Sequence, residues 1–291
     1  MRIKKYHSKI YFLSFADSRM QTAAERIAEQ AKQMGVFEDV FVLNETLLGD
    51  DFKRKWQQVL QPGVRGFGYW CWKPYIILKT LEKLSDNDIL LYCDAGCHLN
   101  PKGLTRLLYY FEQLRNDVLG IKAFAAHYSL IDVKERRWTK GSIFDFFDCR
   151  NKTSVTDSAQ IAATQVMIRK CYRSMDFVNE WYDTICKDFA LIDDTPSKSK
   201  NLSGFIESRH DQSIFSVLFK LRGGIAFPSK ETELGLGGNK DELPIWNIRD
   251  RGYKDTRFIA RLKRWLKSRK ILFKIRFIRL KEKVASFLYN Q

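Results

Sequence analysis

Residues 89–94 read Ile-Leu-Leu-Tyr-Cys-Asp, and Ala95 and Gly96 follow them. The apolar part of this run is too short for a helix and is bounded by turn residues, as expected of a central parallel strand that is covered on both faces. The strand ends on a carboxylate. Because ligands of open α/β sheets bind beyond the carboxyl ends of the strands, Asp94 is predicted to lie at a ligand-binding site.

The segments on either side of this strand indicate an α/β fold. Before it, residues 9–15 and 40–43 have the composition of strands, and Ala23, Ile27 and Ala31 recur between them at helical spacing. After it, helical patterns and strand-like pieces alternate. The helical patterns lie at about 101–115, 171–189 and 211–222, and the strand-like pieces lie near 121–126, 161–168 and 225–227. This alternation predicts a mostly parallel, doubly wound sheet flanked by helices.

The composition of the chain argues against several classes of protein. Its six cysteines form no CxxC pair and no His/Cys cluster, so neither a structural zinc site nor a disulfide framework is expected, and a reducing, cytosolic location fits best. Lys4 and Lys5 precede the apolar stretch 10–15, which we interpret as the first strand rather than a signal peptide because it is short and lacks a cleavage site. No apolar run approaches the roughly 18 to 20 residues that a membrane-spanning helix needs.

The positive charge is concentrated at the C-terminal end. The formal charge of the whole chain is +16. Residues 249–291 hold fifteen Lys and Arg against three Asp and Glu, which is +12 and leaves +4 for residues 1–248. We therefore expect a body, residues 1–248, and a basic tail, residues 249–291.

Residues 257–283 of this tail contain twelve Lys and Arg and one acid, and their large apolar residues fall near one side of a helical projection. These apolar residues are Phe258, Leu262, Trp265, Leu266, Phe273, Phe277 and Leu280. The pattern predicts a basic amphipathic helix, or two short helices with a break near Ser268, that binds an anionic membrane surface. A solvated run of charge and a nucleic-acid-binding segment are the alternatives.

Residues 65–74 read Arg-Gly-Phe-Gly-Tyr-Trp-Cys-Trp-Lys-Pro. This stretch, followed by residues 88–96, resembles a group of bacterial polysaccharide and lipopolysaccharide glycosyltransferases. Residues 138–140, Trp-Thr-Lys, and residues 209–216, Arg-His-Asp-Gln-Ser-Ile-Phe-Ser, are similar to the same group. The resemblance therefore spans roughly residues 9–248.

The resemblance implies a GT-A fold for the body, in which the first half binds a nucleotide sugar and the later half binds the acceptor. The implied activity is transfer of a hexose, with a UDP-sugar as the expected donor, to a cell-surface glycan or to a lipid-linked or lipopolysaccharide precursor. Combined with the basic tail, it implies a cytoplasmic protein that is peripheral on the inner face of the cell membrane. No nucleic acid is expected as a partner.

The resemblance places Asp94 at the metal-binding carboxylate of GT-A enzymes, but Asp-Ala-Gly stands here where many of those enzymes have Asp-x-Asp. This departure leaves a requirement for Mn²⁺ or Mg²⁺ open. His210 is the candidate second ligand, or a donor to the diphosphate, because a neutral imidazole can coordinate a metal and a protonated one can neutralise phosphate charge. The structural alternatives are an Asp94 that caps the helix after Pro101 or closes a turn, and a His210 in a surface loop.

Asp211 and Gln212 stand just before the helical pattern at 211–222. Asp211 is a candidate general base and shares the catalytic assignment with Asp94, whereas Gln212 and Lys140 are candidates for contacts with the acceptor. Capping of the helix is the structural alternative for Asp211.

The remaining candidates are expected to contact the donor together with Asp94. Ser14 and Asp17 lie at the end of the first strand, where a GT-A enzyme contacts the nucleobase and ribose. Arg65 and Lys73 would place positive charge against the diphosphate. Trp70 has a ring suited to stacking on a base or sugar, with core packing as the alternative. Gly96 completes the turn after Asp94.

Two other functions remain open from the sequence. The chain could be a nucleic-acid-binding protein in which the α/β body is a scaffold and the tail contacts phosphates. It could also be a sugar-nucleotide binder without catalytic activity. The first of these alternatives puts the binding charge in the tail, whereas a glycosyltransferase needs a charged site in the body.

Overall fold

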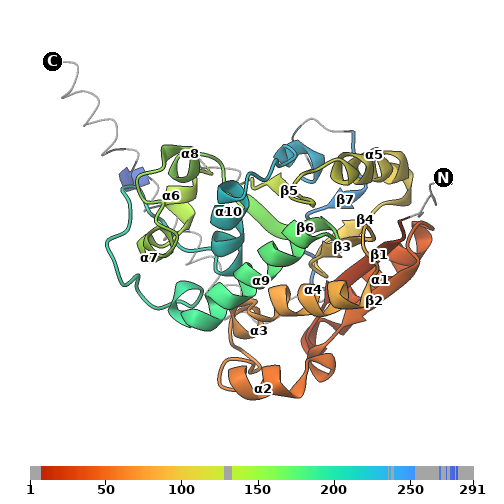
Figure 1. Ribbon diagram of the computed structural model, residues 1–291, viewed down its shortest axis with the longest axis horizontal. Helices are drawn as coiled ribbons and strands as arrows, with labels where there is room; N and C mark the ends of the chain where they lie inside the picture. The colour runs from red at the N-terminus through yellow and green to blue at the C-terminus, as the bar shows by residue number, and fades with distance from the viewer. Residues whose placement is uncertain are drawn as a thin grey trace.

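The computed structural model describes residues 8–127, 133–234, 236 and 239–252, and residues 269, 273, 276–278 and 280 beyond them. Its centre is a five-stranded sheet with the strand order β2-β1-β3-β6-β5, and a two-stranded sheet pairs β4 with β7 (Figure 1). The strands are β1 (Ile10–Phe15), β2 (Asp39–Leu43), β3 (Ile89–Cys93), β4 (His98–Leu99), β5 (Ile121–Ala125), β6 (Ile161–Arg169) and β7 (Ile245–Trp246).

Four strands of the large sheet point in one direction. β1 is parallel to β2 and to β3, whereas β6 is antiparallel to both β3 and β5. The predicted α/β fold with a mostly parallel sheet is confirmed, and the strand expected near 161–168 is present. It runs against its neighbours because the chain passes from β5 to β6 through short helices beyond the sheet end, rather than through a helix that crosses a face of the sheet (Figure 1).

Helices cover both faces of the sheet. The α-helices are α1 (Gln21–Gln33), α2 (Asp50–Trp56), α3 (Gly66–Tyr69), α4 (Trp72–Lys83), α5 (Leu104–Arg115), α6 (Glu135–Trp138), α7 (Gly141–Phe146), α8 (Thr153–Thr156), α9 (Tyr172–Lys187) and α10 (Asp211–Leu221). α1 and α5 share a core with one face of β1 and β3, and α4, α9 and α10 share a core with the other.

The alternation of side chains along β3 explains this arrangement. Leu90 and Tyr92 belong to the core with α4, α9 and α10, whereas Ile89, Leu91 and Cys93 belong to the core with α1 and α5. All five are 0% exposed, so the prediction of a central strand covered on both faces is confirmed. Burial of each large apolar side chain contributes roughly 1.5 to 3 kcal/mol, so this strand holds the two layers together.

The other expected elements are found with small changes. The helical pattern at 101–115 begins with a 3-10 turn, Pro101–Gly103, and continues as α5. The strand-like piece at 225–227 is reduced to one bridge between Phe124 and Phe227, because the chain leaves the edge of β5 after that contact. The patterns at 171–189 and 211–222 are confirmed as α9 and α10.

Most of the predicted basic tail lies outside the described residues. Its described positions 269, 273, 276–278 and 280 are helical. Within the part of the chain that the structure describes, no helix has the length and apolar character required to cross a membrane.

Candidate functional site

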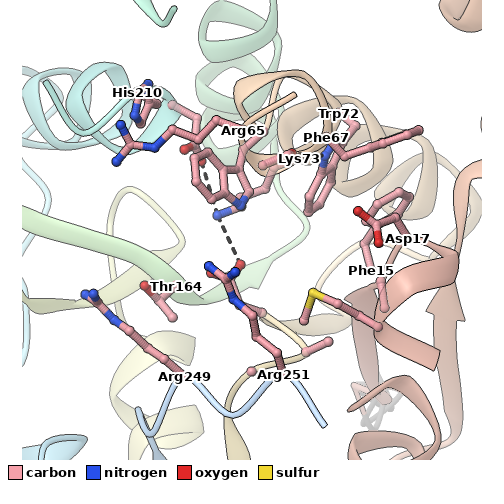
Figure 2. A pocket seen from close by; sticks show the side chains of 18 of the residues that line it. Phe15, Asp17, Arg65, Phe67, Trp72, Lys73, Thr164, His210, Arg249 and Arg251 are labelled. Atoms are coloured by element: carbon pink, nitrogen blue, oxygen red, sulfur yellow. Dashed lines mark hydrogen bonds and ion pairs between the residues drawn. The ribbon is translucent and has the colours of Figure 1, made fainter. Parts of the chain in front are cut away.

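A pocket of about 470 Å³ opens at the carboxyl ends of β1 and β3 (Figure 2). This is the edge of the sheet at which the sequence predicted a ligand site. Most of the predicted site residues line it. They are Asp17, Arg65, Trp70, Lys73, Asp94, Gly96, His210, Asp211 and Gln212.

Two predicted site residues lie outside the pocket lining. The hydroxyl of Ser14 is fully buried and donates a hydrogen bond to the carbonyl oxygen of Cys93 at 2.7 Å, which ties β1 to β3. Lys140 is also buried, and its Nζ contacts the carbonyl oxygen of Asp193 at 2.9 Å and a carboxylate oxygen of the same residue at 3.2 Å. In this structure both side chains hold backbone in place behind the site.

A buried ammonium group lies between the two carboxylates of the pocket. Lys73 Nζ is 3.1 Å from Asp94 Oδ1 and 3.1 Å from Asp211 Oδ2, and it also donates a hydrogen bond to the carbonyl oxygen of Ala163 at 3.1 Å. The hydroxyl of Tyr92 donates a second hydrogen bond to Asp94 Oδ1 at 2.6 Å. The side chain of Asp94 remains 30% exposed, whereas that of Asp211 is 4% exposed.

The charges of this group follow from its surroundings. Burial opposes the charged form of Lys73, but Asp211 and Asp94 outweigh it and raise the pKa of the ammonium above its usual value. Burial raises the pKa of Asp211 to about 6, and the charge of Asp94 adds to this effect while Lys73 opposes it. At neutral pH Lys73 is therefore an ammonium and Asp211 is mostly ionised.

The loop before Lys73 makes a left-handed turn. Residues 66–70, Gly-Phe-Gly-Tyr-Trp, all have positive φ, between 50° and 91°. Each of the three non-glycine residues in this conformation costs roughly 1 to 2 kcal/mol. Backbone strain of this kind persists where the surrounding structure fixes it, and it is concentrated at functional sites.

Aromatic packing holds the turn. Trp72 stacks on Phe15 with ring centroids 4.0 Å apart, and its Nε1 donates a hydrogen bond to the carbonyl oxygen of Gly66 at 3.0 Å. A Cβ atom on Gly66 would lie 2.4 Å from Trp70 Cδ2, so only glycine allows the ring of Trp70 to fold back over the turn. Trp70 is half-buried and Trp72 is buried in the core, and both line the pocket.

His210 lies at the start of α10 and is neutral at pH 7. Its Nδ1 bonds to the carbonyl oxygen of Ile192 at 2.5 Å, and its ring lies beside Tyr69 and Trp70. Burial, helped by the charge of Arg65, lowers the pKa of the imidazole to about 4. The Nε2 atom is buried and has no hydrogen-bond partner among the described residues.

The residues present do not fit a divalent metal ion. Asp94 and Asp211 converge, but on Lys73, so the position between the two carboxylates is taken by a cation of the chain itself. Hard divalent cations need several free oxygen ligands, and Oδ1 of Asp94 is engaged by Tyr92 and Lys73. In the ranges that the structure describes, no three His, Cys, Asp or Glu side chains are arranged to hold a metal. Both members of the predicted ligand pair, Asp94 and His210, line the pocket, and their role as metal ligands stays a prediction.

Two arginines that were assigned to the tail line the pocket. Residues 247–252 cross the end of β3, and Arg249 and Arg251 enter the pocket from this segment (Figure 2). Neither has a hydrogen bond or an ion pair to another described residue. Their place in the site could not be predicted, because one arginine pair in a tail with fifteen basic residues carries no distinguishing signal.

The pocket as a whole attracts anions. Among the described residues, six basic and three acidic side chains line it, and the acidic ones are Asp17, Asp94 and Asp211. Asp17 pairs with Arg19, and both other carboxylates pair with Lys73. The basic lining residues are Arg19, Arg65, Lys73, Arg209, Arg249 and Arg251. An arrangement of this kind suits a phosphorylated ligand.

No protein-family model and no curated protein matches this chain. A glycosyltransferase involved in the glycosylation of the major capsid of PBCV-1 is similar in structure, with a TM-score of 0.42 and 12% identity over 77% of this chain and 82% of that chain. The galactosyltransferase LgtC has a TM-score of 0.41 and 16% identity over 76% and 74%. Mouse xyloside xylosyltransferase 1 has a TM-score of 0.42 and 10% identity over 76% and 84%. Similarity this distant carries no chemistry to the site.

The packing of Trp70 over Gly66 leads to a stability prediction. We expect Gly66→Ala to lower the free energy of unfolding by about 2 kcal/mol more than Gly63→Ala, because the new methyl group meets the Trp70 ring. Gly63 is the matched control, since it also has positive φ but has nothing within 4 Å of an added Cβ. Urea unfolding of both variants measures the difference, and equal losses would contradict the packing described for the turn.

Proposed function

We propose that this chain is a glycosyltransferase that moves a hexose from a nucleotide sugar, with a UDP-sugar as the expected donor, to a cell-surface glycan or a lipid-linked acceptor. The observation that carries the proposal is the position of Lys73. The motif at 65–74 and the strand at 88–96, which together resemble glycosyltransferases, meet at the contact between its ammonium and Asp94. The contact lies in a basic pocket at the carboxyl ends of the strands.

The dimensions and lining of the pocket support a nucleotide-sugar ligand. A volume of about 470 Å³ lies within the range of roughly 300 to 1,000 Å³ that is usual for small-molecule sites. The half-buried ring of Trp70 offers a surface for a base or a sugar, and the arginines offer partners for phosphate oxygens. A nucleic-acid strand needs an open basic groove instead.

The proposed reaction exchanges one bond of the anomeric carbon for another. The bond to the diphosphate oxygen breaks, and the nucleoside diphosphate leaves with the electron pair. A bond forms between the anomeric carbon and the acceptor hydroxyl oxygen, and we assign the proton of that hydroxyl to Asp211. With a pKa of about 6, this carboxylate is ionised at neutral pH and close to the range in which proton transfer is efficient.

Asp94 and Gln212 complete the proposed site. Asp94 is the more exposed of the two carboxylates, so we assign it to the contact with the donor. Gln212 accepts a hydrogen bond from the backbone N–H of Ala163 at 3.2 Å and donates one to Gln160 at 2.9 Å. These contacts fix its side chain at the pocket wall, where we propose that it orients the acceptor.

The assignments of Asp94 and Asp211 predict a loss of turnover. Diphosphate release from a panel of nucleotide sugars should fall about 100-fold or more in Asp211→Asn, since general base catalysis typically contributes 10² to 10⁴. Turnover should fall in Asp94→Asn as well. Asp51→Asn is the control and should keep its turnover, because the side chain of Asp51 is 93% exposed on α2. Undiminished turnover in a folded Asp94 or Asp211 variant would remove that residue from the proposed site.

Asp211 also predicts the pH dependence. Burial raises its pKa to about 6, and the reaction needs the deprotonated form. The value of kcat/KM should therefore be constant above that pH and fall as the pH drops through it.

We further propose that the basic tail holds the enzyme on the inner face of the membrane, near a lipid-linked acceptor. Residues 257–283 hold twelve Lys and Arg, and each basic residue near an anionic surface contributes about 1 kcal/mol. Phe273, Phe277 and Leu280 recur at helical spacing and are 74%, 50% and 60% exposed, which suits shallow insertion into lipid.

The membrane proposal predicts that the tail is required for vesicle binding. The full chain should sediment with phosphatidylcholine vesicles that contain phosphatidylglycerol and not with pure phosphatidylcholine. A chain that ends at residue 252, which retains the two pocket arginines, should stay in the supernatant and keep donor hydrolysis. Sedimentation of both chains alike, or tail-dependent binding to DNA but not to vesicles, would contradict the membrane role.

A further inference from the structure

We infer that this donor site binds the diphosphate with side chains of its own, chiefly Arg249 and Arg251, in place of a divalent metal ion. The inference rests on the proposed function, since it takes the ligand to be a nucleoside diphosphate. It goes beyond that function by naming what stabilises the leaving group.

The first reason is the occupant of the position between the carboxylates. Lys73 Nζ lies 3.1 Å from an oxygen of each of Asp94 and Asp211, and its side chain is 4% exposed. A divalent cation bound to Asp94 would lie next to this ammonium, and the two like charges would repel each other in a poorly hydrated environment. The ammonium thus occupies the position between the two carboxylates that a metal ion would need.

The second reason is the backbone that covers Gly96. A Cβ atom on Gly96 would lie 3.3 Å from Cα of Arg249 and 3.4 Å from its carbonyl carbon. The backbone N–H of Asp250 donates a hydrogen bond to the carbonyl oxygen of Gly96 at 2.9 Å. The position where Asp-x-Asp enzymes carry their second carboxylate is therefore crowded by the segment that brings in Arg249. The packing of residues 249 and 250 on Gly96 thus leaves little room for a carboxylate at position 96 and brings the guanidinium of Arg249 to the pocket.

The third reason is that the segment is firmly attached. Asp250, between the two arginines, accepts a hydrogen bond from Arg26 at 2.9 Å, and His98 Nε2 lies 3.0 Å from the same carboxylate oxygen. Arg26 also donates to the carbonyl oxygens of Ala95 and Asp250 at 2.8 and 2.9 Å. These contacts hold the backbone of residues 249–251 against the turn after Asp94, so the side chains of Arg249 and Arg251 start from a fixed place at the pocket.

The two arginines lack the partners that the other pocket arginines have. Arg65 pairs with Asp194 at 3.2 Å, and Arg19 pairs with Asp17 at 2.5 Å. Arg249 and Arg251 make no ion pair or hydrogen bond with any other residue in the described part of the chain, and both line the pocket (Figure 2). A guanidinium can donate two parallel hydrogen bonds to a phosphate group, so these two side chains have the chemistry and the freedom to hold a diphosphate.

The test is binding of UDP, GDP and inorganic pyrophosphate to the full chain, measured by titration calorimetry in EDTA and again in MnCl₂. We expect the tightest of these ligands to bind with a dissociation constant that differs by no more than about threefold between the two buffers. Arg249→Ala and Arg251→Ala should each weaken this binding by about tenfold in EDTA, as expected for loss of a charge-assisted hydrogen bond. Arg54→Ala is the matched control, because this arginine is 76% exposed on α2.

Two outcomes would overturn the inference while leaving the proposed function intact. One is UDP or GDP binding that appears only with MnCl₂. The other is EDTA-resistant binding that both arginine variants keep in full. If none of the three probes binds in either buffer, the proposed function fails and this inference fails with it. Direct titration of Mn²⁺ into the protein without nucleotide gives an independent readout. We expect Asp94→Asn to leave any Mn²⁺ binding unchanged, because Asp94 is not a metal ligand under this inference.

Discussion

The contact of one buried ammonium with two carboxylates fixes the geometry of the whole site. Lys73 comes from α4, Asp94 from the end of β3, and Asp211 from the first turn of α10. A buried charge must be paired, because an unpaired one costs several kcal/mol. The turn at 66–70, the central strand and α10 are therefore arranged so that the three charged groups are in contact.

The same contact explains why Asp94 does not act alone. Its Oδ1 accepts a hydrogen bond from Tyr92 and pairs with Lys73, and these contacts anchor the side chain. The other carboxylate oxygen, Oδ2, remains for a contact with a ligand in the pocket. On the opposite side, residues 249–251 are fixed to the turn after Asp94 through Asp250. Lys73 with its two carboxylates and the segment that carries Arg249 and Arg251 thus line different parts of the pocket.

The sequence predicted the part of this arrangement that local patterns encode. β3 was predictable because a strand buried on both faces must be apolar throughout, and Asp94 followed from its place at the strand end. The direction of β6 was not predictable, since a buried strand has the same composition in either direction. Arg249 and Arg251 were assigned to the tail because their place in the pocket depends on the contact of Asp250 with Arg26, 224 residues away in sequence. Ser14 is predicted from its place at the end of the first strand and Lys140 from its charge, but both side chains are buried and contact backbone carbonyl oxygens instead of the pocket.

A crystal structure of the full chain grown with UDP and MnCl₂, with data collected at the manganese absorption edge, tests whether chain cations hold the diphosphate. The geometry described here predicts diphosphate oxygens within hydrogen-bond distance of Arg249 and Arg251, with Lys73 still between Asp94 and Asp211 and no anomalous peak beside them. A manganese peak bonded to Asp94 and to the diphosphate, with Lys73 displaced, would contradict it.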